Sequence, residues 1–529
     1  MERKEFVRCT PECVGIPSSA VLRLLDRLEY GGFTEMHSLM IMRGDKICAE
    51  GWWAPYAPGL HHALHSLSKT WTAAAVGLAE YAGLLKVTDR VCDLLPEYMP
   101  DPLPERTARI TVRDLLTMSC GHDAELPNYD PGWKQAFFAQ PQPHEPGTFW
   151  FYNTHGSAII SAVVEKVTGM DMMEWLDSRL FRVIGVDGRR VLCRRDADGT
   201  CLGGHGMFAS TEDNLRLMRL FLRNGEWDGV RLLSEDFVRD AVSFQMDCAP
   251  AHAEIPWFHD NCCGYGYQIW MCRIKGSYRA DGAYGQFAVV VPELDLIVSI
   301  TEAGYIGKRV FQNDLNRQTG FPMVEPDHPV PGPQLTLDAL FEILVPAIDP
   351  KITELPPDLA ARVLSERLRR LAVPNPAGRD AAWCGREFTA ELTAEGRGIS
   401  FRMLQGIAVH NRQRPGAQHI LLQTDIDRLT LRFTEDSQEF LLEADMRGGR
   451  TSGRLVFRQE PDIVSETACA AWWSGDTLEL SVIFTETENH NRFSFTFGED
   501  TVSVRRWTES GISVPLAEEQ AVYRMRGNR

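Results

Sequence analysis

Apolar residues recur at helical spacing over much of the first two thirds of the chain. Between Pro17 and Tyr30, leucine and valine side chains repeat every three or four positions, which predicts an amphipathic helix. An alanine-rich apolar run that ends near Leu85 predicts a buried helix. The same kind of pattern predicts further helices over residues 111–118, 156–168, 171–180, 211–224, 234–242 and 335–345.

Strand-like segments lie at the two ends of this helical region. Residues 38–42 and 46–52 flank Arg43-Gly44-Asp45, a turn signal that predicts a β-hairpin. Strand-like runs return at residues 264–272, 283–291 and 296–301. Early and late strands with helices between them predict an α+β fold. In this fold one antiparallel sheet joins both ends of the region and is flanked by helices, with a helical insertion.

The pattern changes after residue 348. Residues 349–376 are rich in proline and contain a charged helical stretch, so we interpret them as a linker between domains of residues 1–348 and 377–529. Short strand-like runs recur in the second domain, which predicts an all-β barrel of the lipocalin-like kind or a sandwich. These runs cover residues 399–403, 419–424, 428–433, 439–444, 468–473, 478–484, 492–497 and 502–507.

The composition of the chain indicates which binding partners and which cellular location to expect. The chain is 44% hydrophobic and 24% charged, which is ordinary for a soluble globular protein. Its net charge of -17 argues against nucleic acid or an anionic membrane surface as a partner. We find no apolar stretch of membrane-span length and no secretory signal at the N-terminus, so a cytoplasmic location is expected. The thirteen cysteines are then reduced thiols rather than a disulfide framework.

The first candidate for chemistry is an S-x-x-K motif formed by Ser66 and Lys69 at the start of the alanine-rich helix. Three residues make almost one helical turn, so the hydroxyl and the amine share a face. The helix N-terminus adds free N–H groups where an oxyanion could form. The alternative is a capping serine and a solvated lysine. Nearby His61, His62 and His65 lack a further ligand, so we expect loop histidines and no metal site.

Two downstream segments could complete a site. Pro146-Gly147-Thr148 is a turn signal that leads through an aromatic run to Tyr152, Asn153 and Thr154, just before a long apolar helix. The polar ends of these side chains could point into a site. The alternative is a buried aromatic cluster in which Asn153 caps the helix. Asp281, Gly282 and Ala283 open a strand, and a glycine there allows the backbone to approach a ligand closely.

In this order, the segments resemble the penicillin-binding-protein and class C β-lactamase-like family of serine hydrolases. Ser66-Leu67-Ser68-Lys69 matches S-x-x-K, residues 115–122 are similar to the LLTM-S-G-H segment, and residues 152–154 are similar to Y-x-N. The resemblance covers roughly residues 10–345. It implies Ser66 as nucleophile, either Lys69 or Tyr152 as base, and the N–H groups of Ser66 and Ala283 as oxyanion hole. It implies no cofactor.

Two departures from the family pattern bear on the substrate. Thr154 stands where the family usually has asparagine, so either Asn153 or Thr154 would orient Lys69 or a substrate amide. Ala280-Asp281-Gly282 replaces K-T-G, and Asp281 would repel a substrate carboxylate or bind a substrate amine. The resemblance therefore implies the esterase or amidase branch, which acts on a small-molecule ester or amide.

Two other functions remain open from the sequence. The first is a β-lactamase or D-amino-acid peptidase type of amidase within the same family. The second is a non-catalytic scaffold or binding protein of the same fold, for example a homo-oligomer built through the β domain.

Overall fold

The structure is a computed structural model of the 529-residue chain. It describes residues 5–252, 259–304, 308–310, 323–325, 332–375, 387–401, 416–456, 464–508 and 519–526. The chain forms two compact units. The first holds the residues up to Trp52, those from 57 to 304, and those from 332 to 371. The second holds residues 53–56 and the chain from residue 372 onward.

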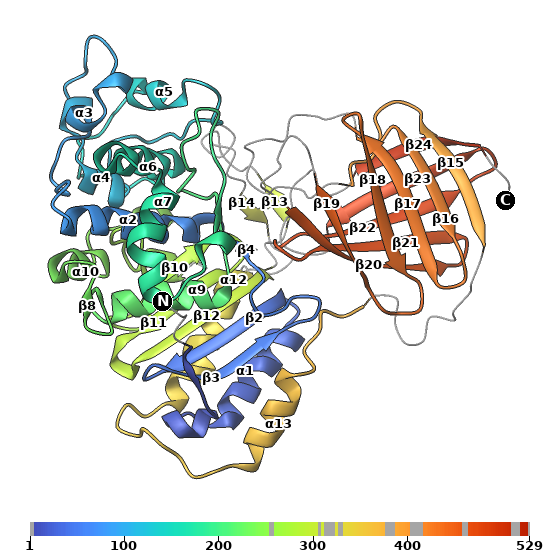
Figure 1. Ribbon diagram of the computed structural model, residues 1–529, viewed down its shortest axis with the longest axis horizontal. Coiled ribbons are helices and arrows are strands. Elements are labelled where there is room, and N and C mark those ends of the chain that lie inside the picture. Colours follow the sequence, from blue (N-terminus) through green and yellow to red (C-terminus); the bar gives the residue numbers. More distant parts are fainter. Residues whose placement is uncertain are drawn as a thin grey trace. The chain divides into compact units, whose positions relative to one another are not determined.

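A seven-stranded sheet forms the centre of the first unit, in the order β1-β3-β2-β12-β11-β10-β9 (Figure 1). As predicted, its middle joins early and late segments, because β2 pairs antiparallel with β12. The predicted hairpin is also present, and its turn residues Gly44 and Asp45 both have positive φ, at 58° and 60°. The strands are β1 (Val7–Arg8), β2 (Thr34–Arg43), β3 (Lys46–Trp52), β9 (Trp270–Met271), β10 (Tyr278–Gly282), β11 (Gln286–Val291) and β12 (Leu296–Gly304).

Helices cover both faces of this sheet. Helices α1, α12 and α13 pack against one side, and α9 packs against β2, β11 and β12 on the other side (Figure 1). The helical insertion includes α2, which packs against β10, and α6, which packs against α2. The helices are α1 (Ser18–Tyr30), α2 (Ser68–Tyr81), α3 (Val91–Leu94), α4 (Val112–Leu116), α5 (Trp133–Ala139), α6 (Thr154–Thr168), α7 (Met172–Leu176), α8 (Arg182–Ile184), α9 (Thr211–Leu222), α10 (Glu235–Ala241), α12 (Gly332–Ala339) and α13 (Leu359–Leu368).

The first unit also contains small sheets of short strands. Strand β6 (Met207–Ala209) pairs with β4 (His62–Ala63) and β5 (Leu192–Cys193), and β7 (Glu226–Trp227) pairs with β8 (Val230–Arg231). The pair of β4 and β6 anchors the segment just before Ser66. Strands β13 (Lys308–Val310) and β14 (Met323–Glu325) form a separate two-stranded sheet.

Several expected elements differ from the structure. Asp281, Gly282 and Ala283 were expected to open a strand, but Asp281 and Gly282 end β10, and residues 283–285 form the turn before β11. Residues 399–401 were expected to lie in a barrel strand but are irregular, and residues 402–403 lie outside the described part of the chain. Residues 264–272 form a tight turn and only a two-residue strand, because Gly264 and Gln268 have positive φ values of 113° and 57° that break an extended chain. Helix α13 was expected inside the linker but belongs to the first unit. It packs against α1, and its Arg367 forms ion pairs with Asp26 and Glu29.

The second unit contains the β barrel that the strand-like runs predicted. Its ten strands are hydrogen-bonded in the order β18-β17-β16-β15-β24-β23-β22-β21-β20-β19, and a contact of Asp445 on β18 with Ala470 on β20 closes the barrel. Alternate side chains such as Leu431, Phe433 and Leu442 fill the interior. The strands are β15 (Phe388–Ala394), β16 (His419–Thr424), β17 (Arg428–Glu435), β18 (Gln438–Asp445), β19 (Thr451–Val456), β20 (Val464–Ser474), β21 (Thr477–Phe484), β22 (His490–Phe497), β23 (Thr501–Thr508) and β24 (Glu519–Arg526).

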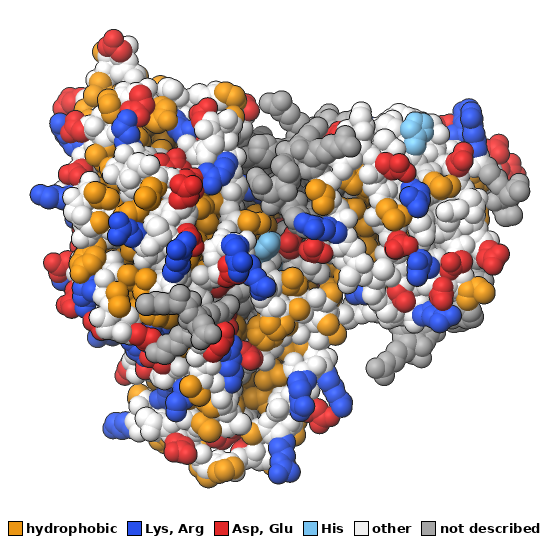
Figure 2. All heavy atoms as spheres, in the orientation of Figure 1, with side chains coloured by type: hydrophobic (Ala, Val, Ile, Leu, Met, Phe, Trp, Pro, Cys, Tyr) orange, Lys and Arg blue, Asp and Glu red, His pale blue; other side chains and the backbone are white. Residues whose placement is uncertain are grey.

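The surface carries charges of both signs. On the face drawn in Figure 2, acidic and basic side chains are interspersed, so the net charge of -17 does not gather into one patch there. Among the described residues, no helix has both the length and the apolar character needed to cross a membrane.

Candidate active site

Ser66 lies in a single 3-10 turn, His65–Leu67, that runs directly into helix α2. No side chain caps the start of either element, so the capping role that the sequence left open for Ser66 is not the one it has. His65 just before it has a positive φ of 47°, a conformation that is uncommon for a residue other than glycine and that often occurs at functional sites. The half-buried Ser66 hydroxyl is therefore available for other contacts.

Lys69 is buried one helical turn later, with only 1% of its surface exposed. Its Nζ donates to Ser66 Oγ at 3.0 Å and to the carbonyl oxygen of Gly204 at 2.5 Å. Burial lowers the pKa of Lys69 to about 7, although the charges of Glu125 and Asp281 act in the opposite direction. A large fraction of this amine is therefore neutral near pH 7 and can accept a proton.

Tyr152 approaches the same two residues from the other side. Its hydroxyl lies close enough to Ser66 for that serine to affect the pKa of the phenol, and its ring centroid lies 4.8 Å from Lys69 Nζ. Trp270 stacks on the ring at a centroid distance of 5.7 Å. Burial raises the pKa of Tyr152, and the neighbouring Ser66 hydroxyl offsets only part of that effect. The phenol therefore keeps its proton at neutral pH.

Asn153 and Thr154 take different directions at the start of α6. Asn153 caps the helix, because its side-chain oxygen accepts the N–H of Gly156 at 3.0 Å. The Thr154 hydroxyl points back toward the site and lies 3.5 Å from Lys69 Nζ. Of the two residues that the sequence offered for orienting Lys69, Thr154 is the one within reach of it.

The end of strand β10 passes close to the segment before Ser66. A Cβ added at Gly282 would lie 2.1 Å from the carbonyl oxygen of Leu64, so only glycine permits this approach. Among the described residues, neither the N–H of Ser66 nor that of Ala283 donates a hydrogen bond to a protein group. These two donors are therefore free to bind a carbonyl oxygen as it becomes negatively charged.

We expect Gly282→Ala to lower the stability and the activity together. The added methyl group must push β10 away from Leu64, at a cost of about 1–3 kcal/mol in the free energy of unfolding. The same shift would move Ala283 and lower kcat for ester hydrolysis by about tenfold. Thermal unfolding and steady-state kinetics measure the two effects. Gly156→Ala is the matched control, because its nearest contacts are ordinary at 3.7 Å. An unchanged Gly282 variant would contradict this account of the strand end.

Asp281 is paired with a residue that the sequence analysis did not select. Arg279 Nε donates to Asp281 Oδ2 at 2.7 Å, and the Arg279 side chain is completely buried while Asp281 remains 21% exposed. Burial raises the pKa of Asp281, and the Arg279 guanidinium opposes that effect. The i,i+2 spacing in Arg279-Ala280-Asp281 was the available signal, since it places both side chains on one face of a strand.

Glu125 and His205 are further residues near the site that the sequence analysis missed. Glu125 Oε1 accepts the N–H of Thr154 at 2.5 Å and that of His155 at 3.2 Å, so it caps α6 beside Lys69. His205 follows the carbonyl that Lys69 binds, and burial holds its pKa well below the ordinary value. Both residues lie on connecting segments without a sequence motif, so only the fold brings them to the site.

Among the described residues, the histidines before Ser66 do not form a group of metal ligands. His61 bonds the carbonyl of Arg190, and His62 bonds the ring of His37, so these histidines contact protein groups. One other group, formed by Glu165, Asp171 and Cys201, could bring three donor atoms within 4.8 Å of one another. Arg195 forms an ion pair with Asp171, and that pair already supplies a cation there.

The chain is similar to a known protein family and to several known proteins. The family model described as Beta-lactamase matches residues 34–318. Penicillin-binding protein 4* of Bacillus subtilis (strain 168) is 29% identical over 153 residues, which are 25% of this chain and 31% of that protein. The 6-aminohexanoate-dimer hydrolase of Paenarthrobacter ureafaciens is 23% identical over 224 residues, which are 39% of this chain and 57% of that protein. The chain thus matches less than two thirds of the length of either relative.

Among solved structures, the octameric penicillin-binding protein homologue from Pyrococcus abyssi superposes with a TM-score of 0.45 and 13% sequence identity. The match covers 96% of this chain and 99% of that chain.

Proposed function

Because this chain belongs to the beta-lactamase family, we propose that it is a serine hydrolase that cleaves an ester or amide of a small molecule through an acyl-enzyme at Ser66. One observation carries the proposal. The Ser66 hydroxyl lies 3.0 Å from the amine of Lys69, and burial lowers the pKa of that amine to about 7. A serine activated by an adjacent base is the general arrangement of nucleophilic catalysis.

Lys69 is the better candidate for the general base. A base works best when its pKa lies near the working pH, and the pKa of Lys69 meets this condition. The pKa of Tyr152 is raised, so its phenol is a proton donor in the resting site. We therefore assign Tyr152 to the delivery of a proton to the leaving group.

The proposed reaction has two steps. Neutral Lys69 takes the proton of Ser66 as Oγ attacks the carbonyl carbon, and the N–H groups of Ser66 and Ala283 bind the oxyanion. The bond to the leaving group then breaks, and the proton passes from Lys69 through the Tyr152 hydroxyl to that group. In the second step Lys69 takes a proton from water, the hydroxide attacks the acyl carbon, and Ser66 recovers its proton as it leaves.

A covalent probe tests the nucleophile directly. Incubation with a fluorophosphonate, followed by digestion and mass spectrometry, should give one adduct on the peptide that contains Ser66. The heat-denatured chain is the control, since it keeps every serine but loses the site and should remain unlabelled. An adduct on a different serine, or equal labelling of the denatured chain, would show that Ser66 is not the activated nucleophile.

A further inference from the structure

We propose that the site prefers substrates that carry a protonated amine beside the scissile bond, and that Asp281 binds this amine. The inference rests on the proposed function and adds the class of substrate to it. Four observations support it: the free oxygen of Asp281, the burial of Arg279, the network that holds Arg279, and the balance of charges around Ser66.

Asp281 offers one oxygen to a ligand. Its Oδ2 accepts the N–H of Arg279, whereas its Oδ1 has no hydrogen-bond partner in the part of the chain that the structure describes. The carboxylate is 21% exposed and stands next to Gly282 and Ala283 on the strand end that faces Ser66. Strand β10 packs against the turn His65–Leu67 that holds Ser66, so its end lies beside the reacting groups.

Arg279 pairs with Asp281, and its other donors are bonded to further protein groups. One Nη donates to the carbonyl oxygens of Asp260 and Met271, both at 3.1 Å, and the other donates to Asn261 at 2.5 Å. With the side chain completely buried, these bonds hold the guanidinium behind Asp281. Arg279 can therefore orient the Asp281 carboxylate but is not exposed to receive a substrate carboxylate.

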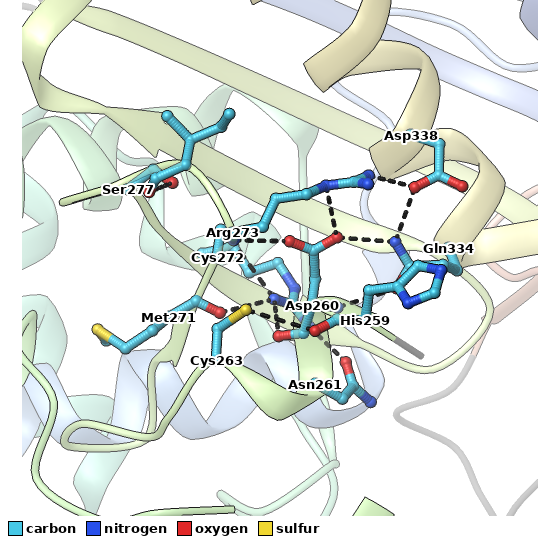
Figure 3. A network of polar contacts seen from close by, with 12 residues as sticks. His259, Asp260, Asn261, Cys263, Met271, Cys272, Arg273, Ser277, Gln334 and Asp338 are labelled. Carbon is cyan, nitrogen blue, oxygen red and sulfur yellow. Dashed lines mark hydrogen bonds and ion pairs between the residues drawn. The ribbon is translucent and has the colours of Figure 1, made fainter. Parts of the chain in front are cut away.

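A polar network keeps Asp260, and through it Arg279, in place (Figure 3). The buried Asp260 carboxylate accepts the N–H of Arg273 at 2.9 Å and Gln334 Nε2 at 2.7 Å. Arg273 and Gln334 both reach Asp338, so the network connects β9 and β10 with helix α12. Because five groups fix one another in this way, Arg279 cannot easily turn toward the substrate.

The remaining charges near Ser66 favour a cation. Glu125 is 6% exposed and acidic, and Lys69 is largely neutral when it acts as the base. Among the described residues, the two charged groups that act on Lys69 are Glu125 and Asp281, so a substrate carboxylate bound beside Lys69 would be repelled by both. An ammonium group would instead form a charge-assisted hydrogen bond with Asp281 Oδ1 in partly desolvated surroundings, where such bonds are strong.

Three methyl esters that differ in charge test the proposal on the full chain at pH 7. Alanine methyl ester has an ammonium group, N-acetylalanine methyl ester is neutral, and N-succinylalanine methyl ester is anionic. We expect kcat/KM to fall in that order. Asp281→Asn should lower kcat/KM for the cationic ester by about 10- to 100-fold, the range expected for a hydrogen bond to a charged group. It should change kcat/KM for the neutral ester by less than about threefold.

Matched variants separate binding from structure. Asp123→Asn removes the same charge at an exposed position and should leave all three values unchanged. The asparagine side chain at position 281 can still accept the Arg279 bond, and thermal unfolding checks that the fold is kept; if it is not, Asp281→Ser takes its place. The proposal would be overturned if Asp281→Asn lowered kcat/KM equally for all three esters, or if the wild-type enzyme preferred the anionic ester.

A binding measurement keeps this inference separate from the proposed function. If none of the esters is hydrolysed, the hydrolase proposal fails, and calorimetric titration with benzylamine and with benzoate still decides the charge preference. Binding of benzylamine that weakens at least tenfold in Asp281→Asn supports the proposal. Equal binding of the two ligands, or no effect of the substitution, contradicts it.

Discussion

Replacing Ser66 by alanine should lower kcat for the hydrolysis of a p-nitrophenyl ester by about four to six orders of magnitude. The reason is that the acyl-enzyme cannot form without the Oγ atom, and the remaining oxyanion donors and Lys69 cannot replace it. KM should change little, because the alanine leaves the surrounding contacts in place. Steady-state kinetics of the purified variant, with active-site titration to exclude contaminating wild-type enzyme, measure the effect.

Ser68→Ala is the matched control for this substitution. Ser68 lies two residues away, but its Oγ accepts the N–H of Met207 at 3.0 Å and has a structural role. Its loss should cost about 1 kcal/mol of stability and change kcat by less than tenfold. If Ser66→Ala retained more than about a hundredth of the wild-type kcat, another nucleophile would have to be sought.

Replacing Lys69 by methionine should lower kcat/KM by about two to four orders of magnitude. Methionine has a similar length and fills the buried space, but it cannot accept the proton of Ser66. The loss therefore measures proton transfer rather than packing. Lys166→Met is the control, because this lysine on α6 is exposed and pairs with Glu97 away from Ser66.

The pH dependence of the wild-type enzyme tests the same assignment. Lys69 must be neutral to act as a base, and its pKa is lowered to about 7. Below that pH the amine is protonated, so kcat/KM should fall about tenfold for each further pH unit; above it, the rate should reach a plateau. The decrease of kcat/KM below pH 7 should be absent from the Lys69→Met variant. A wild-type profile that is flat between pH 5 and pH 8 would exclude Lys69 as the base.

Local patterns in the sequence predicted most of the elements. The hairpin around Gly44 and Asp45, helix α1 and the barrel strands follow from spacing and turn residues, which act over a few positions. The pairing of Ser66 with Lys69 has the same origin, because three residues along a helix always bring two side chains to one face. The strand expected over residues 264–272 is mostly absent, because positive φ values outweigh the apolar pattern there. Helix α13 is present as expected, but its contacts with α1 put it in the first unit rather than in a linker.

The sequence by itself determined most of the longer strands and helices and the presence of Ser66, Lys69 and Tyr152 in a recognisable order. Only the tertiary structure decided that Thr154 rather than Asn153 reaches Lys69, and that Arg279 lies buried behind Asp281. It alone brought Gly282 against Leu64, from a distant part of the chain. The physical reason is range: periodicity is set by neighbouring residues, whereas these contacts join distant segments whose approach depends on the packing of the whole unit.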